Sequence, residues 1–321
     1  GRIFVDFYAT LGPSCATREV LLQMFRQGMT GARLNLSHVG LAGCAPMLEE
    51  FHAAARAAGV TPKLVIDLQG PEERVGRLEE PLLLKENQTV RLGEEIPVSR
   101  RVLQLLAPGD KIALDDSALL LEVEHPGQCR VLQGGTLYSR KSLAVLGKST
   151  NAPALTPEDL QNLDQAAQFG VTGLLQPFVR GREDIQEVRK ALSARNLSQI
   201  RIMAKIENRQ GLDKLEEILK AADEICIARG DLGNAIPLWE LPGIQKRIAS
   251  ACKMAVKPFC LSTQLLWSMQ SRPVPTRAEV CDIFNGVLDG ASGLMLTGET
   301  AIGKYPDRAM EFLVKTAKTA G

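Results

Sequence analysis

The sequence predicts an α/β protein, a (β/α)₈ TIM barrel with a small all-β domain inserted after the third barrel strand. Eight short apolar runs alternate with amphipathic helical patterns, and this helical period disappears between Leu68 and Leu155. A length of 321 residues suits one such barrel or two ordinary domains. We expect residues 1–70 and 154–321 to form the catalytic barrel domain and residues 71–153 to form the inserted domain.

The predicted barrel elements follow each other in strict alternation. The strands are near-continuous apolar runs, as expected of parallel strands buried on both faces, at residues 4–10, 32–36, 63–68, 173–178, 201–206, 224–228, 258–262 and 293–296. The helices are predicted at residues 18–27, 45–58, 157–169, 182–194, 211–221, 239–254, 276–288 and 306–319. Pro157 and Pro306 suit first-turn helix positions.

The inserted domain is predicted from short alternating segments separated by turn dipeptides. The segments are residues 89–92, 111–114, 119–123 and 129–132, and the turns are Pro108-Gly109, Pro126-Gly127 and Gly134-Gly135. An insertion after a barrel strand lies at the carboxyl ends of the strands, where barrel enzymes have their active sites. We therefore expect a lid over the site, and a purely decorative insertion is the alternative.

Composition and charge exclude several classes of protein. A net charge of +1 gives no field for nucleic acid, which we do not expect as a partner. No apolar run approaches the roughly 20 residues of a membrane span, and no basic-then-apolar leader is visible. The seven cysteines are scattered, which favours reduced, buried thiols in a cytoplasmic protein.

Three strings at strand ends carry the chemistry: AKIEN (204–208), ARGDLG (228–233) and STQ (262–264). Lys205 and Glu207 are two residues apart on one strand, so they point to the same face. Asp231 follows the next strand at a Gly-Asp turn, and two carboxylates from adjacent strands can hold Mg²⁺. Lys205 could then neutralise a transferring phosphoryl group. A purely structural Lys–Glu pair is the alternative.

A second polar group is predicted at the ends of strands two and three. Arg33, Asn35 and Ser37 alternate along one face, and Asp67 ends the third strand. Their oxygens suit a monovalent or hard divalent cation, and Arg33 suits a phosphate. Strand-end capping is the alternative for Ser37.

Three further residues carry weaker signals. Thr263 ends the seventh strand and could position a proton or a carboxylate, although a lone threonine is usually structural. Arg74 and Lys141 belong to the inserted domain or its hinge and could reach anionic groups if a lid closes. Surface basic residues are more often simply solvated.

Taken together, these strings resemble the pyruvate kinase family over nearly the whole chain. The matching stretches are ATLGPS (9–14), GARLNLSH (31–38), DLQGPEERVG (67–76), GDKIALDD (109–116), AKIEN, ARGDLG, KPFCLSTQLLWSM (257–269), PTRAEVCDIFNGVLDGA (275–291) and LTGETAIGKYP (296–306). The resemblance implies a barrel with a mobile β lid after strand three. It also implies a short form, since the family's C-terminal regulatory domain is absent, and regulation by a sugar bisphosphate is therefore not implied.

The resemblance implies separate roles for the matching residues. Glu207 and Asp231 are similar to the ligands of Mg²⁺ or Mn²⁺. Lys205, Arg33 and Thr263 resemble the catalytic residues, with Thr263 near the carbon that is protonated. The backbone amides at Gly230 and Asp231 would receive the substrate carboxylate, as a helix N-terminus can. The remaining roles are a K⁺ site (Asn35, Ser37, Asp67 and the carbonyl of Leu68), a mark of K⁺ dependence (Glu72) and nucleotide contacts (Arg74, Lys141, His38, Asn35).

The function implied is transfer of phosphate from phosphoenolpyruvate to ADP, giving pyruvate and ATP, with Mg²⁺ and K⁺. The lid stretch KSLAVLGKS (141–149) and Ser117-Ala118 depart from the family pattern, so two alternatives stay open. One is a paralogue that acts on another phosphoenolpyruvate or oxo-acid substrate by metal-assisted enolate chemistry. The other is a non-catalytic paralogue that binds a metabolite. The sequence is also compatible with a homodimer formed through the barrel.

Overall fold

Eight parallel strands close into a barrel in this computed structural model, which describes residues 4–321. The strands are β1 (Asp6–Thr10), β2 (Gly31–Asn35), β3 (Lys63–Asp67), β12 (Gly173–Gln176), β13 (Arg201–Ile206), β14 (Glu224–Ala228), β15 (Phe259–Ser262) and β16 (Gly293–Leu296). Each barrel strand pairs with the next, and β16 pairs with β1, so the sheet has no free edge. The predicted barrel is confirmed.

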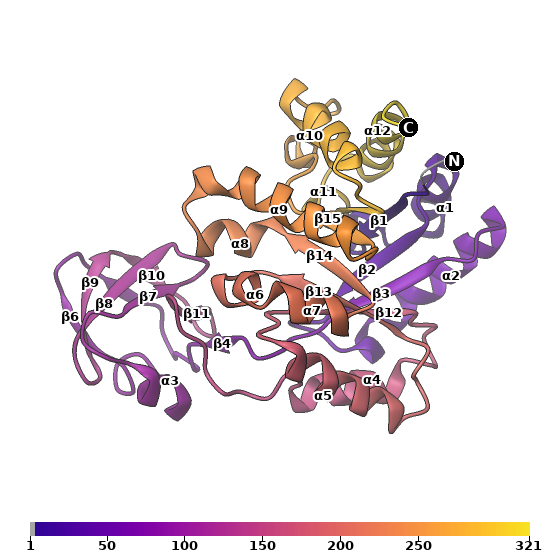
Figure 1. The fold of residues 1–321 in the computed structure, drawn as a ribbon. Helices are drawn as coiled ribbons and strands as arrows, with labels where there is room; N and C mark the ends of the chain where they lie inside the picture. The colour runs from indigo at the N-terminus through magenta and orange to yellow at the C-terminus, as the bar shows by residue number, and fades with distance from the viewer. Residues whose placement is uncertain (1–3) are drawn as a thin grey trace.

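Helices connect the barrel strands, and the longer ones cover the outer face of the sheet (Figure 1). They are α1 (Arg18–Gln27), α2 (Ala45–Ala58), α4 (Pro157–Gln165), α5 (Arg182–Ser193), α6 (Arg209–Asp213), α7 (Leu215–Ala221), α8 (Arg229–Ala235), α9 (Leu241–Met254), α10 (Arg277–Leu288), α11 (Gly298–Ala301) and α12 (Pro306–Lys318). Their ends follow local chemistry. Thr156 forms a capping box with Asp159 before Pro157, and Gly28 ends α1 in the left-handed region at φ 119°.

The interior of the barrel is filled by side chains that alternate with those facing the helices. An apolar layer inside the barrel consists of Tyr8, Val65, Leu175, Met203, Cys226, Ala228, Cys260 and Met295. It is separate from the large core between strands and helices. Because side chains alternate along a strand, Lys205 shares the inward face of β13 with Met203, and Glu207, the residue directly after β13, continues that face. The polar residues of β13 therefore continue the inner column of the barrel toward its carboxyl end.

The inserted segment forms two antiparallel sheets with their own apolar core. Its elements are β4 (Glu73–Arg74), β5 (Leu82–Leu84), β6 (Thr89–Arg91), α3 (Arg100–Leu105), β7 (Lys111–Leu114), β8 (Leu119–His125), β9 (Gln128–Gln133), β10 (Gly135–Leu137) and β11 (Ser142–Val145). Figure 1 shows it standing off one side of the barrel. The expectation of an all-β segment needs one correction, α3. This helix was missed because six residues with one buried side chain, Val102, show no period.

Two further short helices, α8 and α11, were also not predicted, and other differences concern how the predicted helices begin or divide. The single helix predicted over 211–221 is two short helices, α6 and α7. The helix predicted from residue 239 begins at Leu241, after a 3₁₀ turn, with Pro242 in its first turn. Of the cysteines, Cys281 is exposed and the other six are buried. Among the described residues, no helix combines the length and apolar character needed to cross a bilayer.

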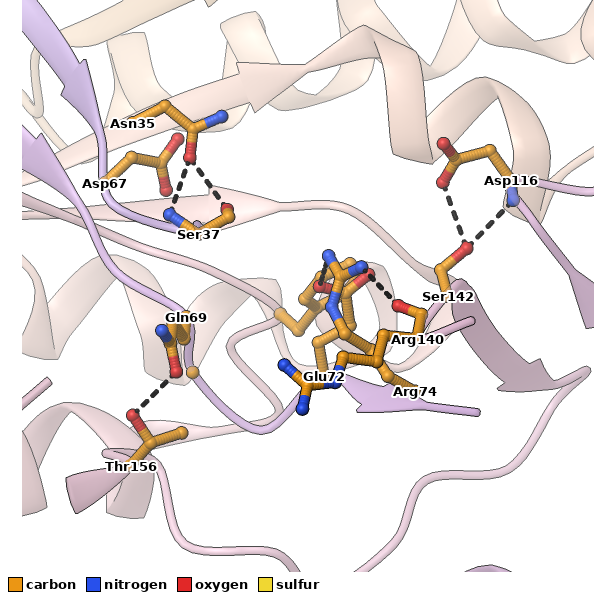
Figure 2. A network of polar contacts seen from close by, with 12 residues as sticks. Asn35, Ser37, Asp67, Gln69, Glu72, Arg74, Asp116, Arg140, Ser142 and Thr156 are labelled. Atoms are coloured by element: carbon orange, nitrogen blue, oxygen red, sulfur yellow. Dashed lines mark hydrogen bonds and ion pairs between the residues drawn. The ribbon is translucent and has the colours of Figure 1, made fainter. Parts of the chain in front are cut away.

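Asp159 ties the two chain segments that connect the barrel to the insertion. Its carboxylate is fully buried and accepts hydrogen bonds from the backbone N–H groups of Gln69 at 2.8 Å, Gly70 at 2.9 Å and Thr156 at 3.1 Å. The Thr156 hydroxyl also donates to the Gln69 side chain at 3.1 Å (Figure 2). One carboxylate thus joins the outgoing segment after β3 to the returning segment before α4.

Replacing Asp159 by alanine leaves three backbone donors without this partner. We expect Asp159→Ala to lower the free energy of unfolding by about 3 kcal/mol, measured by urea denaturation. The matched control on the same helix is Asp164→Ala, which removes a carboxylate that is 60% exposed and bonded to Arg195. The control should change stability by less than about 1 kcal/mol. Equal losses of unfolding free energy in both variants would show that Asp159 does not anchor the segments that connect the barrel to the insertion.

Candidate active site

A lysine ammonium lies between two carboxylates at the carboxyl end of the barrel. Lys205 Nζ lies 3.2 and 3.1 Å from the two oxygens of Asp67 and 3.1 Å from Glu207 Oε1. Arg33 Nε donates to Asp67 Oδ2 at 2.9 Å, and Arg33 Nη1 donates to the Thr10 hydroxyl at 3.1 Å. The structure therefore brings together Lys205, Glu207, Arg33 and Asp67, which the sequence placed on three strands.

The strand register explains why these side chains meet. Arg33 and Asn35 alternate on the inward face of β2, and Asn35 stands opposite Asp67 on the neighbouring β3. Lys205 reaches Asp67 across the barrel interior, since β3 and β13 are separated by β12 in the sheet. Because all strands are parallel, their carboxyl ends meet at one rim, and polar residues from distant parts of the chain converge there.

Burial and charge oppose each other in this cluster. Burial would raise the pKa of Asp67, but Lys205 and Arg33 hold that pKa below its ordinary value. Burial would lower the pKa of Lys205, but Asp67 and Glu207 hold it well above its ordinary value. The stable state is thus a protonated Lys205 beside an ionised Asp67, a buried ion pair to which Arg33 adds a second positive charge.

Glu207 differs from Asp67 because it lacks a complete set of partners. Burial raises its pKa, and the nearby Asp231 raises it further, against the effect of Lys205. Its Oε2 accepts the backbone N–H of Phe178 at 2.7 Å. Its buried Oε1 forms the ion pair with Lys205, but no donor among the described residues meets it with hydrogen-bond geometry. A buried carboxylate oxygen left in this state beside a second carboxylate suits a hard divalent cation.

Asp231 lies in a helix rather than at the Gly-Asp turn expected from the sequence. Helix α8 starts directly after β14, and Asp231 occupies its first turn. The turn signal was misleading because Gly230 serves a packing purpose. A Cβ at that position would lie 3.1 Å from Thr263 Cγ2. In residues 4–321, no three His, Cys, Asp or Glu side chains gather as a metal site, so this corner offers the two carboxylates Glu207 and Asp231.

A second group of oxygens lies at the ends of β2 and β3. Ser37 donates from its backbone N–H and its hydroxyl to Asn35 Oδ1, at 3.0 and 2.7 Å, and Asp67 lies beside them (Figure 2). Leu68 follows β3, is buried, and donates its N–H to the Leu175 carbonyl at 3.2 Å. Neutral and anionic oxygens thus gather at one corner, which is the donor chemistry of an alkali-metal site.

The predicted nucleotide contacts are more dispersed. Arg74 donates to Glu72 at 3.0 Å and to the Arg140 carbonyl at 3.0 Å (Figure 2). Lys141 lies 3.8 Å from Asp115, and His38 is exposed beyond β2. A cleft separates the inserted domain from the barrel, with Asp116, Ser142 and Lys148 on one side and Glu207 and Asp231 on the other. Arg74, Lys141 and His38 lie outside its lining.

Burial and neighbouring charges also change the pKa of Glu72. Desolvation raises its pKa, Arg74 opposes this rise, and Asp231 and Asp116 add to it. Glu72 therefore lies within the electrostatic reach of both the barrel carboxylate Asp231 and the inserted-domain carboxylate Asp116. The segment after β3 places an acidic side chain between the two halves of the molecule.

Two residues of the site gave no usable signal in the sequence. Phe178 follows β12 with φ 50°, a left-handed conformation that is costly for an aromatic residue, and this aims its N–H at Glu207. Arg229 stands inside the ARGDLG string, but the spacing suggested no role for it. Backbone conformation and long-range side-chain contacts identify both residues, and neither is visible in residue spacing.

Residues 5–310 match the family model described as the pyruvate kinase barrel domain. The chain is 40% identical over 324 residues to a pyruvate kinase of Aeropyrum pernix, with 98% of this chain and 70% of the relative covered. It is 36% identical over 325 residues to a pyruvate kinase of Thermococcus litoralis, of which it spans 68%. It is 36% identical over 324 residues to a pyruvate kinase of Geobacillus stearothermophilus, of which it spans 55%.

Removing the central ammonium leaves two buried carboxylates facing each other. We expect Lys205→Met to lower the free energy of unfolding at neutral pH by about 3 kcal/mol, measured by urea denaturation. The lowered pKa of Asp67 stabilises the fold above the ordinary carboxylate pKa, and this contribution is lost as the pH falls through the lowered value. The difference in free energy of unfolding between wild type and variant should therefore become smaller as the pH is lowered.

The control for this change is Lys63→Met at the other end of the barrel. Lys63 pairs with Asp6, but its side chain is 44% exposed, so the loss should stay below about 1 kcal/mol. Two outcomes would contradict the charge arrangement described above. One is a Lys205→Met variant as stable as this control. The other is a difference in free energy of unfolding between wild type and Lys205→Met that grows at low pH.

Proposed function

The chain belongs to the pyruvate kinase family, and from this premise we propose that it transfers the phosphoryl group of phosphoenolpyruvate to ADP. The bond from phosphorus to the enol oxygen breaks, a bond to the ADP oxygen forms, and the enolate carbon takes a proton to give pyruvate. The observation that supports this proposal is the buried Lys205 ammonium held between Asp67 and Glu207 beside the Asp231 carboxylate.

We propose that Glu207 and Asp231 hold Mg²⁺ or Mn²⁺. When bound, this cation would offset negative charge on the phosphate and enolate oxygens. Two observations support this assignment: Oε1 of Glu207 meets no hydrogen-bond donor within residues 4–321, and both side chains are carboxylates. We assign K⁺ to Asn35, Ser37, Asp67 and the Leu68 carbonyl, with Glu72 marking K⁺ dependence.

Lys205 and Arg33 supply positive charge to the transferring group. The pKa of Lys205 is raised well above its ordinary value, so this residue stays protonated and acts as an electrostatic stabiliser rather than as a proton donor. Arg33 is oriented by Asp67 and Thr10, so its guanidinium is in place before substrate arrives. Charge that is already oriented needs no reorganisation when the phosphoryl group moves.

The start of α8 and the residue after β15 complete the proposed substrate site. The backbone amides at Gly230 and Asp231 lie in the first turn of α8 and would receive the substrate carboxylate. Thr263 packs against Gly230 and would stand near the carbon that accepts the proton. In this proposal, the two ends of a three-carbon acid would lie at the segments that follow the neighbouring strands β14 and β15.

We propose that residues 71–153 act as a lid that brings the nucleotide, with Arg74, Lys141, His38 and Asn35 as its contacts. Gly70, at φ 64°, stands at the outgoing end. At the returning end, Arg180 donates to the Thr150 and Ala152 carbonyls, each at 2.7 Å. Since Arg74 is paired with Glu72 and Lys141 lies near Asp115, nucleotide binding would exchange these partners for phosphate oxygens.

The turnover experiment couples pyruvate formation to NADH oxidation by lactate dehydrogenase. With phosphoenolpyruvate, ADP, Mg²⁺ and K⁺, we expect turnover that stops when Mg²⁺ is omitted. Lys205→Met should lower kcat by about 10³-fold or more, because it removes charge stabilisation of the phosphoryl group. The same variant should still exchange the methyl protons of pyruvate with solvent in the presence of metal. Lys63→Met, far from the site, should keep full turnover.

Each contrary outcome of that experiment points to a defined alternative. No pyruvate at high enzyme concentration would overturn the proposed reaction. Metal-dependent turnover of other oxo acids without ADP would support an enolate enzyme with a different substrate. If calorimetry shows no Mg²⁺-dependent binding of oxalate, an enolpyruvate mimic, the chain would be a non-catalytic paralogue.

The nucleotide side of the proposal is tested by Lys141→Ala. Because this change removes a phosphate contact that forms on lid closure, we expect the KM for ADP to rise about tenfold, equivalent to about 1.4 kcal/mol. The KM for phosphoenolpyruvate should stay within about twofold. Lys111→Ala, an exposed lysine on β7 of the same domain, is the control and should change neither value. Equal effects on both substrates would contradict the assignment.

A further inference from the structure

Arg229 connects two elements of the proposed substrate site, helix α8 and the end of strand β15. Its side chain is 13% exposed and pairs with Asp282 of α10 through two bonds of 2.8 Å. Its Nη2 also donates to the Thr263 carbonyl at 2.7 Å, and its Nε donates to the Ser262 carbonyl at 3.3 Å. One guanidinium thus holds the end of β15 against the start of α8 and against α10.

The segment held by Arg229 has an unfavourable backbone conformation. Thr263 has φ 82° and Gln264 has φ 62°. A positive φ is rare for any residue other than glycine and is especially costly for a β-branched threonine, so it persists only where surrounding contacts impose it. Downstream, the fully buried Glu299 of α11 accepts the backbone N–H of Leu266 at 2.9 Å. Arg229 and Glu299 therefore restrain this turn from both of its ends.

Arg229 also determines where α8 lies relative to Thr263. It is the first residue of α8, directly before Gly230 and Asp231, and Gly230 packs against the Thr263 methyl group. A movement of either element would change the space in which the substrate carbon and its carboxylate would lie. The same side chain is thus covalently part of one element and hydrogen-bonded to the other.

We propose that Arg229 is a positioning residue that imposes the left-handed conformation of Thr263 and so sets the geometry of proton delivery to the enolate carbon. This inference rests on the proposed function. An arginine is required because its planar group donates to the carboxylate and to both carbonyls at once, whereas a lysine ammonium at the end of a flexible chain cannot match these directions. Asp282 orients the guanidinium, and Thr263 is the residue through which Arg229 acts.

The first test is a double-mutant cycle between Arg229 and Thr263. Arg229→Lys should slow metal-dependent exchange of the pyruvate methyl protons by about tenfold or more and lower kcat, while the KM for phosphoenolpyruvate changes by less than about twofold. In a Thr263→Ala background the same change should have no further effect on exchange, because the two residues act as a unit. A loss of equal size in both backgrounds would overturn the proposal.

The matched control is Arg195→Lys. Arg195 is also a partly buried arginine, bonded to Asp164 and to the Ala191 carbonyl, but it lies at the end of α5. We expect it to leave both exchange and turnover unchanged. A similar fall in exchange for Arg195→Lys would mean that loss of an arginine acts through general stability, which would overturn the proposal.

The second test needs no catalysis. In the ligand-free protein labelled at threonine methyl groups, the Thr263 resonance is identified by its loss in Thr263→Ala. We expect Arg229→Lys to shift or broaden that resonance and Arg195→Lys to leave it unchanged. An unmoved Thr263 resonance would overturn the positioning role even if the protein forms no pyruvate. Conversely, absent turnover with a moved resonance would overturn the proposed reaction and leave the positioning role supported.

Discussion

The ion cluster of Lys205, Asp67 and Glu207 inside a closed barrel is the interaction on which the site depends. The buried Lys205 is stable as an ammonium because Asp67 and Glu207 lie against it, and Asp67 is stable as a carboxylate because Lys205 and Arg33 pair with it. The closed sheet holds the charged ends of β3 and β13 at a fixed separation across the barrel. In return, the cluster keeps the Lys205 ammonium protonated beside a Glu207 oxygen for which residues 4–321 supply no donor with hydrogen-bond geometry.

Backbone strain is concentrated around this cluster. Phe178 and Thr263 both adopt positive φ within two residues of the end of a barrel strand. Phe178 thereby aims its N–H at Glu207, and Thr263 faces Gly230. Such conformations cost about 1–3 kcal/mol each, so they are retained only where the surrounding structure imposes them. The barrel can offset this unfavourable free energy because its helices and apolar layers stabilise the strands independently of the loops that carry the site.

Buried polar side chains also hold the two segments that connect the barrel to the inserted domain. Asp159 and Arg180 each satisfy several backbone groups of the connecting segments, so these segments are held firmly at the barrel. Within the inserted domain, the pair of Lys141 with Asp115 is long and partly exposed. Firm anchors at the connecting segments and a separate apolar core in the inserted domain are compatible with the lid movement proposed above.

Much of the fold and of the central site could be predicted from the sequence, because their signals are local. All eight barrel strands were located to within a few residues, since buried parallel strands are short apolar runs between helical patterns. Lys205 and Glu207 were assigned to one face by the alternation of a strand alone. The elements missed or divided wrongly are all short, and a short element shows no clear period: α3, α8, α11, the pair α6–α7, and strands β4, β5, β10 and β11 of the insertion.

The sequence by itself therefore determined the barrel, the insertion after the third strand, and the side chains that gather at the carboxyl rim, because these follow from periodicity and parallel strand order. Tertiary structure alone decided how those side chains are paired: Lys205 with Asp67 as well as Glu207, Glu207 with the Phe178 amide, and Arg229 with the strained turn at Thr263. These contacts join residues far apart in the chain across a closed sheet, and their geometry depends on backbone angles and register that no residue pattern encodes.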